Sequence, residues 1–109
     1  MELTQRQAAL CAALGDYNRL LLLYALADEP HSVNELVARV GLSQPAVSRH
    51  LRIMRESGLV SAERHGRSVV YGLVDQRILA AMDLLRAVLT EQMEQQGHVA
   101  RAATQRPPI

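Results

Sequence analysis

Four polar side chains fall close together between residues 44 and 52, at spacings that suit one exposed side of a helix. At about 100° per residue, Arg49 and Arg52 point in similar directions, and Gln44 and Ser48 lie on their flank toward the helix start. Gln, Ser and Arg side chains carry the donors and acceptors that read base edges and hold phosphates. The pattern therefore predicts a helix that contacts nucleic acid, although an ordinary solvated helix face would show the same residue types.

The segment that carries these side chains has the start signal, the stop signal and the apolar face of a packed helix. Ser43 is a good N-cap, and Pro45 fits the first turn, where a missing amide hydrogen costs nothing. Gly58 is a typical residue beyond a helix end, so we expect the helix to run to about Ser57. Its buried face consists of Val47, Leu51 and Met54.

A shorter helix precedes this one. Ser32 and Glu35 have the spacing of a capping box, and apolar residues at helical spacing follow them to Val40. Gly41 supplies the backbone freedom that a sharp turn requires. The stretch from Ser32 to Leu59 therefore predicts a helix-turn-helix.

Two strand-like segments, 59–64 and 68–74, follow directly. They are joined by the tip His65-Gly66-Arg67, with Gly where a hairpin needs it. Arg64 and Arg67 are placed to touch the backbone or the minor groove of a flanking duplex. A helix-turn-helix followed by a basic hairpin is a winged helix-turn-helix, so we expect a mainly α fold with one small β-hairpin.

The segment from Leu42 to Leu51, LSQPAVSRHL, resembles the ArsR/SmtB family of small bacterial winged-helix repressors, and the resemblance extends from about Leu14 to Leu89. It implies a homodimer that represses its own operon and releases DNA when an inducer binds. The two recognition helices would then enter successive major grooves of an imperfect inverted repeat. We expect base contacts from Gln44, Ser48 and Arg49, and phosphate or groove-edge contacts from Ser43, Arg52, Arg64 and Arg67.

His50 lies beside the apolar stripe of the recognition helix, about 60° from its centre by helical geometry. We expect its imidazole either to contact a phosphate or to pack near the wing. The phosphate contact requires the right tautomer or a protonated ring.

Helices are also expected at both ends of the domain. Residues 4–14 and 17–27 should form the first two, and Asp75 should cap a last helix over about residues 76–96. The apolar stripe of that last helix is too long for so small a domain to cover alone, so we expect the chain to dimerise through its terminal helices. We expect one domain over residues 1–97, and a mobile tail over 98–109 because that segment is polar and contains two prolines.

Bulk composition agrees with a single DNA-binding domain. The chain has 109 residues and a net charge of only +1, and all twelve basic residues are Arg. Residues 39–67 hold six Arg and two Glu, a net +4, whereas the remainder holds six Arg and nine acidic residues, a net −3.

No apolar run is long enough to span a membrane and no secretory signal is visible, so we expect a cytoplasmic protein. We also find no catalytic constellation and expect no enzyme activity and no cofactor. A winged-helix module that binds proteins instead of DNA stays open as the alternative.

The metal sites that the resemblance implies are incomplete in this sequence. One family site needs a Cys-X-Cys pair where this chain has Ser32 and Asn34, so no thiolate is available there. The other needs two His and two carboxylates at positions that hold Asp75, Arg77, Val88 and Glu91. A different set, Glu91, Glu94 and His98, lies on one helix face and could hold a metal or be a solvated acidic turn. We therefore assign no metal.

Cys11 is the only thiol in the chain. Its sequence neighbours are small and apolar, so simple core packing is one expectation. If the first helices of two protomers meet, Cys11 could instead form a symmetric disulfide and act as a redox switch. The inducer is not identified by the sequence.

Overall fold

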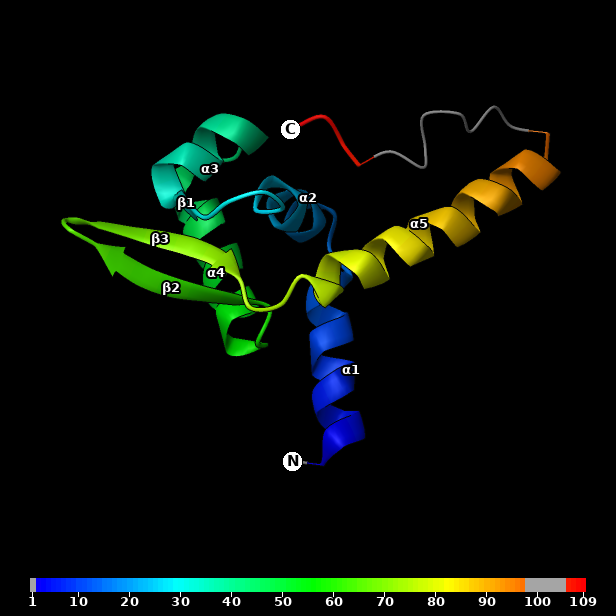
Figure 1. The fold of residues 1–109 in the computed structure, drawn as a ribbon, viewed down its shortest axis with the longest axis horizontal. Helices are drawn as coiled ribbons and strands as arrows, with labels where there is room; N and C mark the ends of the chain where they lie inside the picture. The colour runs from blue at the N-terminus through cyan, green and yellow to red at the C-terminus, as the bar shows by residue number, and fades with distance from the viewer. Residues whose placement is uncertain (1, 98–105) are drawn as a thin grey trace.

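The computed structural model describes residues 2–97 and 106–109, and its helix-turn-helix lies on the side of the molecule that carries the small sheet, away from the last helix (Figure 1). Two helices precede it, a small sheet flanks it, and one long helix follows. In chain order the elements are α1 (Leu3–Leu14), α2 (Tyr17–Ala25), β1 (His31–Ser32), α3 (Val33–Val40), α4 (Gln44–Glu56), β2 (Val60–His65), β3 (Ser68–Leu73) and α5 (Arg77–Gln95).

Local capping sets the boundaries of the helix-turn-helix as expected. The Ser32 hydroxyl accepts the Glu35 N–H at 3.2 Å, and the Glu35 carboxylate accepts the Ser32 N–H at 2.9 Å. Gly41 ends α3 with a φ of 73°, a left-handed conformation that favours glycine. The Ser43 hydroxyl then accepts the Ala46 N–H at 3.3 Å and starts α4.

The sheet has one strand more than the sequence predicted. Its order is β1-β3-β2, and both pairings are antiparallel. The additional strand β1 places His31 opposite Tyr71, directly before α3 begins. It therefore ties the start of the helix-turn-helix to the wing. The hairpin tip itself is shorter than expected, because His65 pairs with Ser68 and only Gly66 and Arg67 lie between the strands.

An aliphatic core holds α4 in place. Val47, Leu51 and Met54 have no exposed surface, which confirms the predicted buried face. They pack with fully buried leucines from α2, α3 and the segment before β2, namely Leu22, Leu23, Leu36 and Leu59. Burial of this kind stabilises a fold by about 25 cal/mol per Å² of apolar surface. The core therefore fixes the opposite, polar side of α4 toward solvent.

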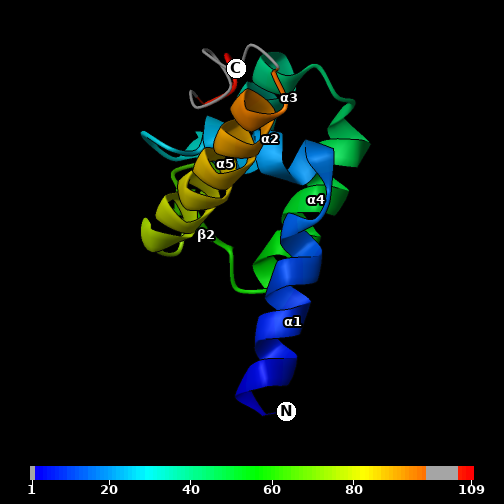
Figure 2. The same cartoon turned by 90° about the vertical axis from the view of Figure 1, so that its right-hand side faces the viewer.

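The terminal helices α1 and α5 extend away from this core (Figures 1 and 2). Ala13 is the one buried residue of α1. On α5 the first half of the apolar stripe is buried at Leu79 and Met82, whereas Leu85 and Leu89 remain 62% and 58% exposed. The outer half of α5 therefore carries apolar surface that the described part of the chain leaves exposed.

Two expectations about the C-terminal part need correction or restriction. The N-cap of α5 is Gln76, without a side-chain cap, although the Asp75 carboxylate accepts the Arg77 N–H at 2.8 Å. The expected tail falls mostly on residues 98–105, which lie outside the described residues. Its last four residues do contact the domain, because Arg106 pairs with Asp83 at 2.8 Å and Ile109 packs against the core. No helix in the described ranges is long and apolar enough to cross a membrane.

Candidate nucleic-acid interface

The polar side of α4 is open to solvent along its whole length. Gln44, Arg49 and Arg52 are exposed, and Ser48 is half-buried between them. A shallow hollow on this face is lined by Pro45, Ser48, Arg49 and Arg52. The structure thus brings together on one surface the four side chains expected to contact bases and phosphates.

Two of these side chains are linked before any ligand binds. The Gln44 amide donates to the Ser48 hydroxyl at 3.2 Å, across one turn at the start of α4. This bond leaves the Gln44 carbonyl oxygen and one amide hydrogen available, which is the pair that bonds an adenine edge. Ser43 uses its hydroxyl oxygen to cap the helix, and its hydroxyl hydrogen stays available to a phosphate.

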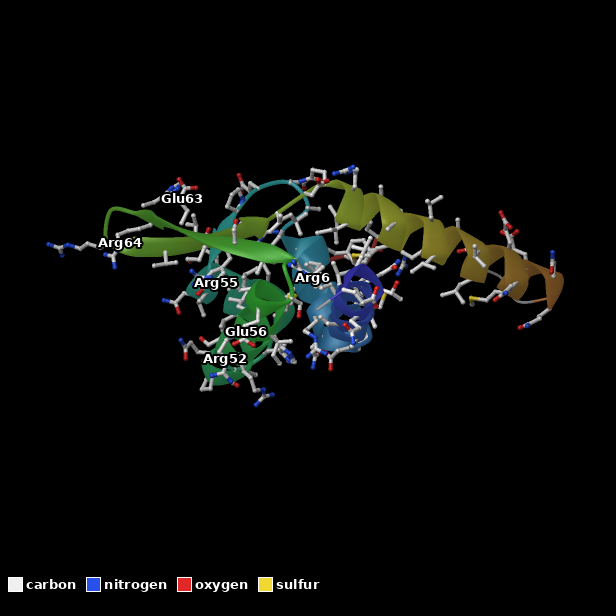
Figure 3. All side chains as sticks on the ribbon, turned by 90° about the horizontal axis from the view of Figure 1, so that it is seen from below. Arg6, Arg52, Arg55, Glu56, Glu63 and Arg64 are labelled. Carbon is white, nitrogen blue, oxygen red and sulfur yellow. The ribbon has the colours of Figure 1, made fainter. Side chains whose placement is uncertain are left out.

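The hairpin carries basic side chains to the outer end of the wing. Arg64 and Arg67 are exposed on either side of the tip, and Gly66 has a φ of 63°. Figure 3 shows Arg64 pointing outward near the hairpin end, and Arg52 pointing outward from α4. His65 lies 3.7 Å from the Glu63 carboxylate, so this histidine already has a partner on its own strand.

Arg55 was left out of the contact set predicted from sequence. It is exposed in the last turn of α4, three residues beyond Arg52, and therefore extends the basic side of the helix. The spacing of Arg49, Arg52 and Arg55 was the available signal, since residues three apart are neighbours on a helix surface.

The position of His50 does not support the expected phosphate contact. The imidazole is only 6% exposed, and its Nδ1 lies 3.4 Å from the Arg19 guanidinium of α2. Burial lowers the pKa of His50 below its ordinary value, and the cations Arg19 and Arg49 lower it further, whereas Asp16 raises it. His50 therefore faces the interior of the domain and contacts Arg19, which is the physical reason why the expected phosphate contact is corrected.

Comparisons with known proteins identify the family to which the chain belongs. A family model described as "Bacterial regulatory protein, arsR family" matches residues 16–62. The HTH-type transcriptional regulator CmtR of Mycobacterium tuberculosis is 38% identical over 98 residues, which make up 89% of this chain and 83% of that protein. The chain belongs to the arsR family of bacterial regulatory proteins. The resemblance noted in the segment 42–51 is thereby confirmed.

Two further similarities define how far the family relation extends. The regulator NmtR of M. tuberculosis is 40% identical over 76 residues, which cover 70% of this arsR-family chain but only 63% of NmtR. The homodimeric winged helix-turn-helix DNA-binding domain of Mb0332 from Mycobacterium bovis superposes with a TM-score of 0.77 and 25% identity. That match covers 88% of this chain and 89% of that domain.

The residues at the family's metal positions make other contacts here. Arg77 binds the Asp75 carboxylate at 2.9 Å, which holds the pKa of Asp75 down at about 2. A guanidinium therefore stands beside the carboxylate that a metal would need. Across residues 2–97 and 106–109, no three His, Cys, Asp or Glu side chains come together as a metal site. The alternative set with Glu91 and Glu94 includes His98, which lies outside the described residues.

Cys11 does not pack into the core. Its side chain is exposed on α1, so the expectation of simple core packing is wrong. The physical reason is that α1 touches the domain mainly near its C-terminal end, where Ala13 is buried. The redox role of Cys11 stays a prediction.

Proposed function

We propose that this arsR-family chain is a dimeric, sequence-specific DNA-binding transcriptional repressor. The observation that carries the proposal is the division of α4 into two sides. One side is fully buried at Val47, Leu51 and Met54, and the other presents Gln, Ser and Arg to solvent beside a basic wing. A helix held in this way can enter a major groove while the wing reaches the adjacent backbone.

The proposed contacts divide by chemistry. Gln44, Ser48 and Arg49, near the start of α4, would contact base edges, because Arg pairs bidentately with guanine and Gln with adenine. Side chains at the helix start, further along α4 and at the wing would hold phosphates and fix the register. These are Ser43, Arg52, Arg64 and Arg67.

We propose that dimerisation uses the outer halves of α1 and α5. Leu3 is 80% exposed and Leu84 is 70% exposed, and they belong to α1 and α5 and not to the elements proposed to contact DNA, α4 and the wing. A second copy related by two-fold symmetry would cover this apolar surface and set two recognition helices side by side. The operator would then be an inverted repeat whose half-sites lie about one helical turn apart.

The proposal has three further parts. The protein represses its own gene, an inducer releases it from DNA, and it resides in the bacterial cytoplasm, where the chromosome lies. A protein-binding module without DNA contacts is disfavoured, because such a module would show acidic or apolar residues on α4 where Arg49 and Arg52 stand. The family consists of regulatory proteins and gives no ground for proposing an enzyme.

The test is fluorescence anisotropy on a labelled duplex from the region upstream of the gene, with chelator and reductant present. We expect tight binding that a scrambled duplex of equal length and composition does not match. Equal affinity for the two duplexes would refute base-specific recognition. A metal or an oxidant can then be added to the formed complex to find what releases it.

A further inference from the structure

One arginine side chain links three helices on the inner side of the recognition helix. Arg19 lies in the first turn of α2, and its Nε donates to the Ala13 carbonyl at the end of α1 at 2.7 Å. Its Nη2 lies 3.5 Å from the Ala12 carbonyl, and its Nη1 lies 3.4 Å from Nδ1 of His50 on α4. The guanidinium therefore binds the last turn of α1 and also touches the recognition helix.

The surroundings hold this guanidinium in place. Asp16 caps α2 by accepting the Arg19 N–H at 3.0 Å, which fixes the backbone from which the side chain starts. Ala13 and His50 are 3% and 6% exposed, so the contacts of the guanidinium with these two residues are partly buried, whereas its contact with the Ala12 carbonyl is exposed. Partly buried hydrogen bonds such as those to Ala13 and His50 are stronger than bonds at an open surface.

The chemistry of the contact requires a neutral imidazole. A guanidinium has donors only, so Nδ1 of His50 must offer its lone pair, and the ring hydrogen must be on Nε2. Protonation would place a hydrogen on Nδ1 and set two cations 3.4 Å apart. The contact would then be lost and replaced by repulsion.

We propose that Arg19 and His50 are positioning residues, which form a joint that fixes α4 relative to α1 and α2 only while His50 is neutral. The inference rests on the proposed function of α4 as the DNA recognition helix. It adds a connection between α1, which we assign to the dimer interface, and the helix that enters the groove. Because two such helices must match the spacing of two half-sites, a small change of angle at each joint reduces operator affinity.

The charges around His50 fix the sign of the pH effect. Burial, together with Arg19 and Arg49, lowers the pKa of His50 from 6.5, and Asp16 acts in the opposite direction. A group whose pKa is lower in the folded than in the unfolded state contributes its full stabilisation at pH values above the unfolded-state pKa. The joint is therefore intact above 6.5 and is lost as the pH falls from 6.5 through the lower folded-state pKa.

The core keeps α4 folded when the joint is absent. Val47, Leu51 and Met54 anchor the helix without any contribution from His50. Loss of the joint should consequently change the angle of α4 and the affinity for operator, and leave the helical content and cooperative unfolding in place. This separates a positioning role from a purely structural one.

The experiment compares operator affinity between about pH 8 and about pH 5.5 for the wild type and His50→Asn. Asparagine sets an amide oxygen near the position of Nδ1 and does not titrate. We expect wild-type affinity to fall several-fold toward the acid end. A difference of about one pKa unit between free and bound protein sets the limit at roughly tenfold for each protomer, which is reached only when the pH lies below both pKa values. His50→Asn should lose this dependence and keep wild-type affinity at the alkaline end.

Two further variants make the comparison decisive. His65→Asn removes an exposed imidazole at the wing and should keep the full acid-side loss, since His65 does not contact Arg19. Arg19→Gln removes the charged donor, so its affinity should be reduced already at alkaline pH and vary little with pH. Circular dichroism spectra and thermal melts confirm that each variant is folded.

The ¹⁵N shifts of the His50 ring give a readout that does not depend on DNA. We expect a hydrogen on Nε2 and none on Nδ1 at alkaline pH. The inference is overturned if Nδ1 carries the hydrogen, if wild-type affinity does not change with pH, or if His50→Asn retains the acid-side loss. If the wild type fails to distinguish operator from scrambled duplex at alkaline pH, the proposed function fails, and the ring shifts still decide whether the joint exists.

Discussion

Arg49 and Arg67 are both exposed arginines, yet their positions predict different effects on DNA binding. Arg49 lies on the open face of α4, beside Ser48, where a helix in the major groove meets base edges. Arg67 lies at the hairpin tip, where a wing meets the sugar–phosphate backbone. Substitution of each by alanine removes one positive charge, so a difference between the two variants reports position and not net charge.

The expected magnitudes follow from two copies of each side chain in the dimer. Loss of one phosphate contact reduces the slope of log K against log salt by about 0.9, so Arg67→Ala should reduce it by about 1.8. Between about 50 and about 200 mM salt, the wild type should then lose roughly twelvefold more affinity than this variant. A bidentate base contact is worth about 1–3 kcal/mol of discrimination, so Arg49→Ala should cost about 2–6 kcal/mol on operator over two half-sites.

The assay is anisotropy on operator and scrambled duplexes at several salt concentrations. Arg67→Ala should weaken binding to both duplexes by a similar factor, whereas Arg49→Ala should weaken operator binding far more. Refutation would come from two variants that lose the same factor on both duplexes with the same change in salt slope. Such a result would mean that α4 contributes charge but reads no bases.

Three other predictions concern the dimer, the core and one ion pair. Leu85→Glu places a charge on the exposed outer half of α5, so sedimentation should show a folded monomer that has lost operator binding, and an unchanged dimer would contradict the proposed interface. Leu51→Ala removes a side chain with no exposed surface and should lower the free energy of unfolding by about 2–5 kcal/mol in denaturant titrations. Arg77→Ala should raise the pKa of Asp75 from about 2 toward 3.8 in an NMR titration, because the Arg77 side chain is the main cause of the lowering. In the wild type, the Arg77–Asp75 ion pair therefore contributes to folding stability above pH 3.8, and this contribution is lost as the pH falls toward about 2. An unshifted titration midpoint of Asp75 in the variant would argue against the contact.

The features that sequence predicted well are set by short-range rules. Three such features are the capping box at Ser32 and Glu35, the glycine at 41 and the N-cap at Ser43. Each of them involves only residues that lie within four positions of one another. Their geometry depends on backbone groups of the same turn, so the local sequence is sufficient. The same holds for the buried face of α4, which follows from helical spacing alone.

The features that sequence missed depend on residues far apart in the chain. Strand β1 has two residues and no periodicity, and it exists because His31 pairs with Tyr71. Helical spacing placed His50 near the edge of the apolar stripe but could not supply its partner, since Arg19 lies 31 positions earlier. Cys11 has apolar neighbours in sequence, but only the final turn of α1 is held against the domain, so the thiol stays exposed.

The two contacts that the Arg19 guanidinium makes with Ala13 and His50 differ in strength, and this difference determines which contact breaks first. The bond from Nε to the Ala13 carbonyl is short at 2.7 Å, whereas the contact from Nη1 to His50 is long at 3.4 Å. Hydrogen bonds weaken with length, so acid or a displacement of α1 should break the contact with α4 first. Arg19 would then stay with α1 and leave α4 held by its apolar face alone. A change at the proposed dimer interface would thus reach the recognition helix through the last turn of α1, although the proposed DNA contacts lie on α4 and the wing.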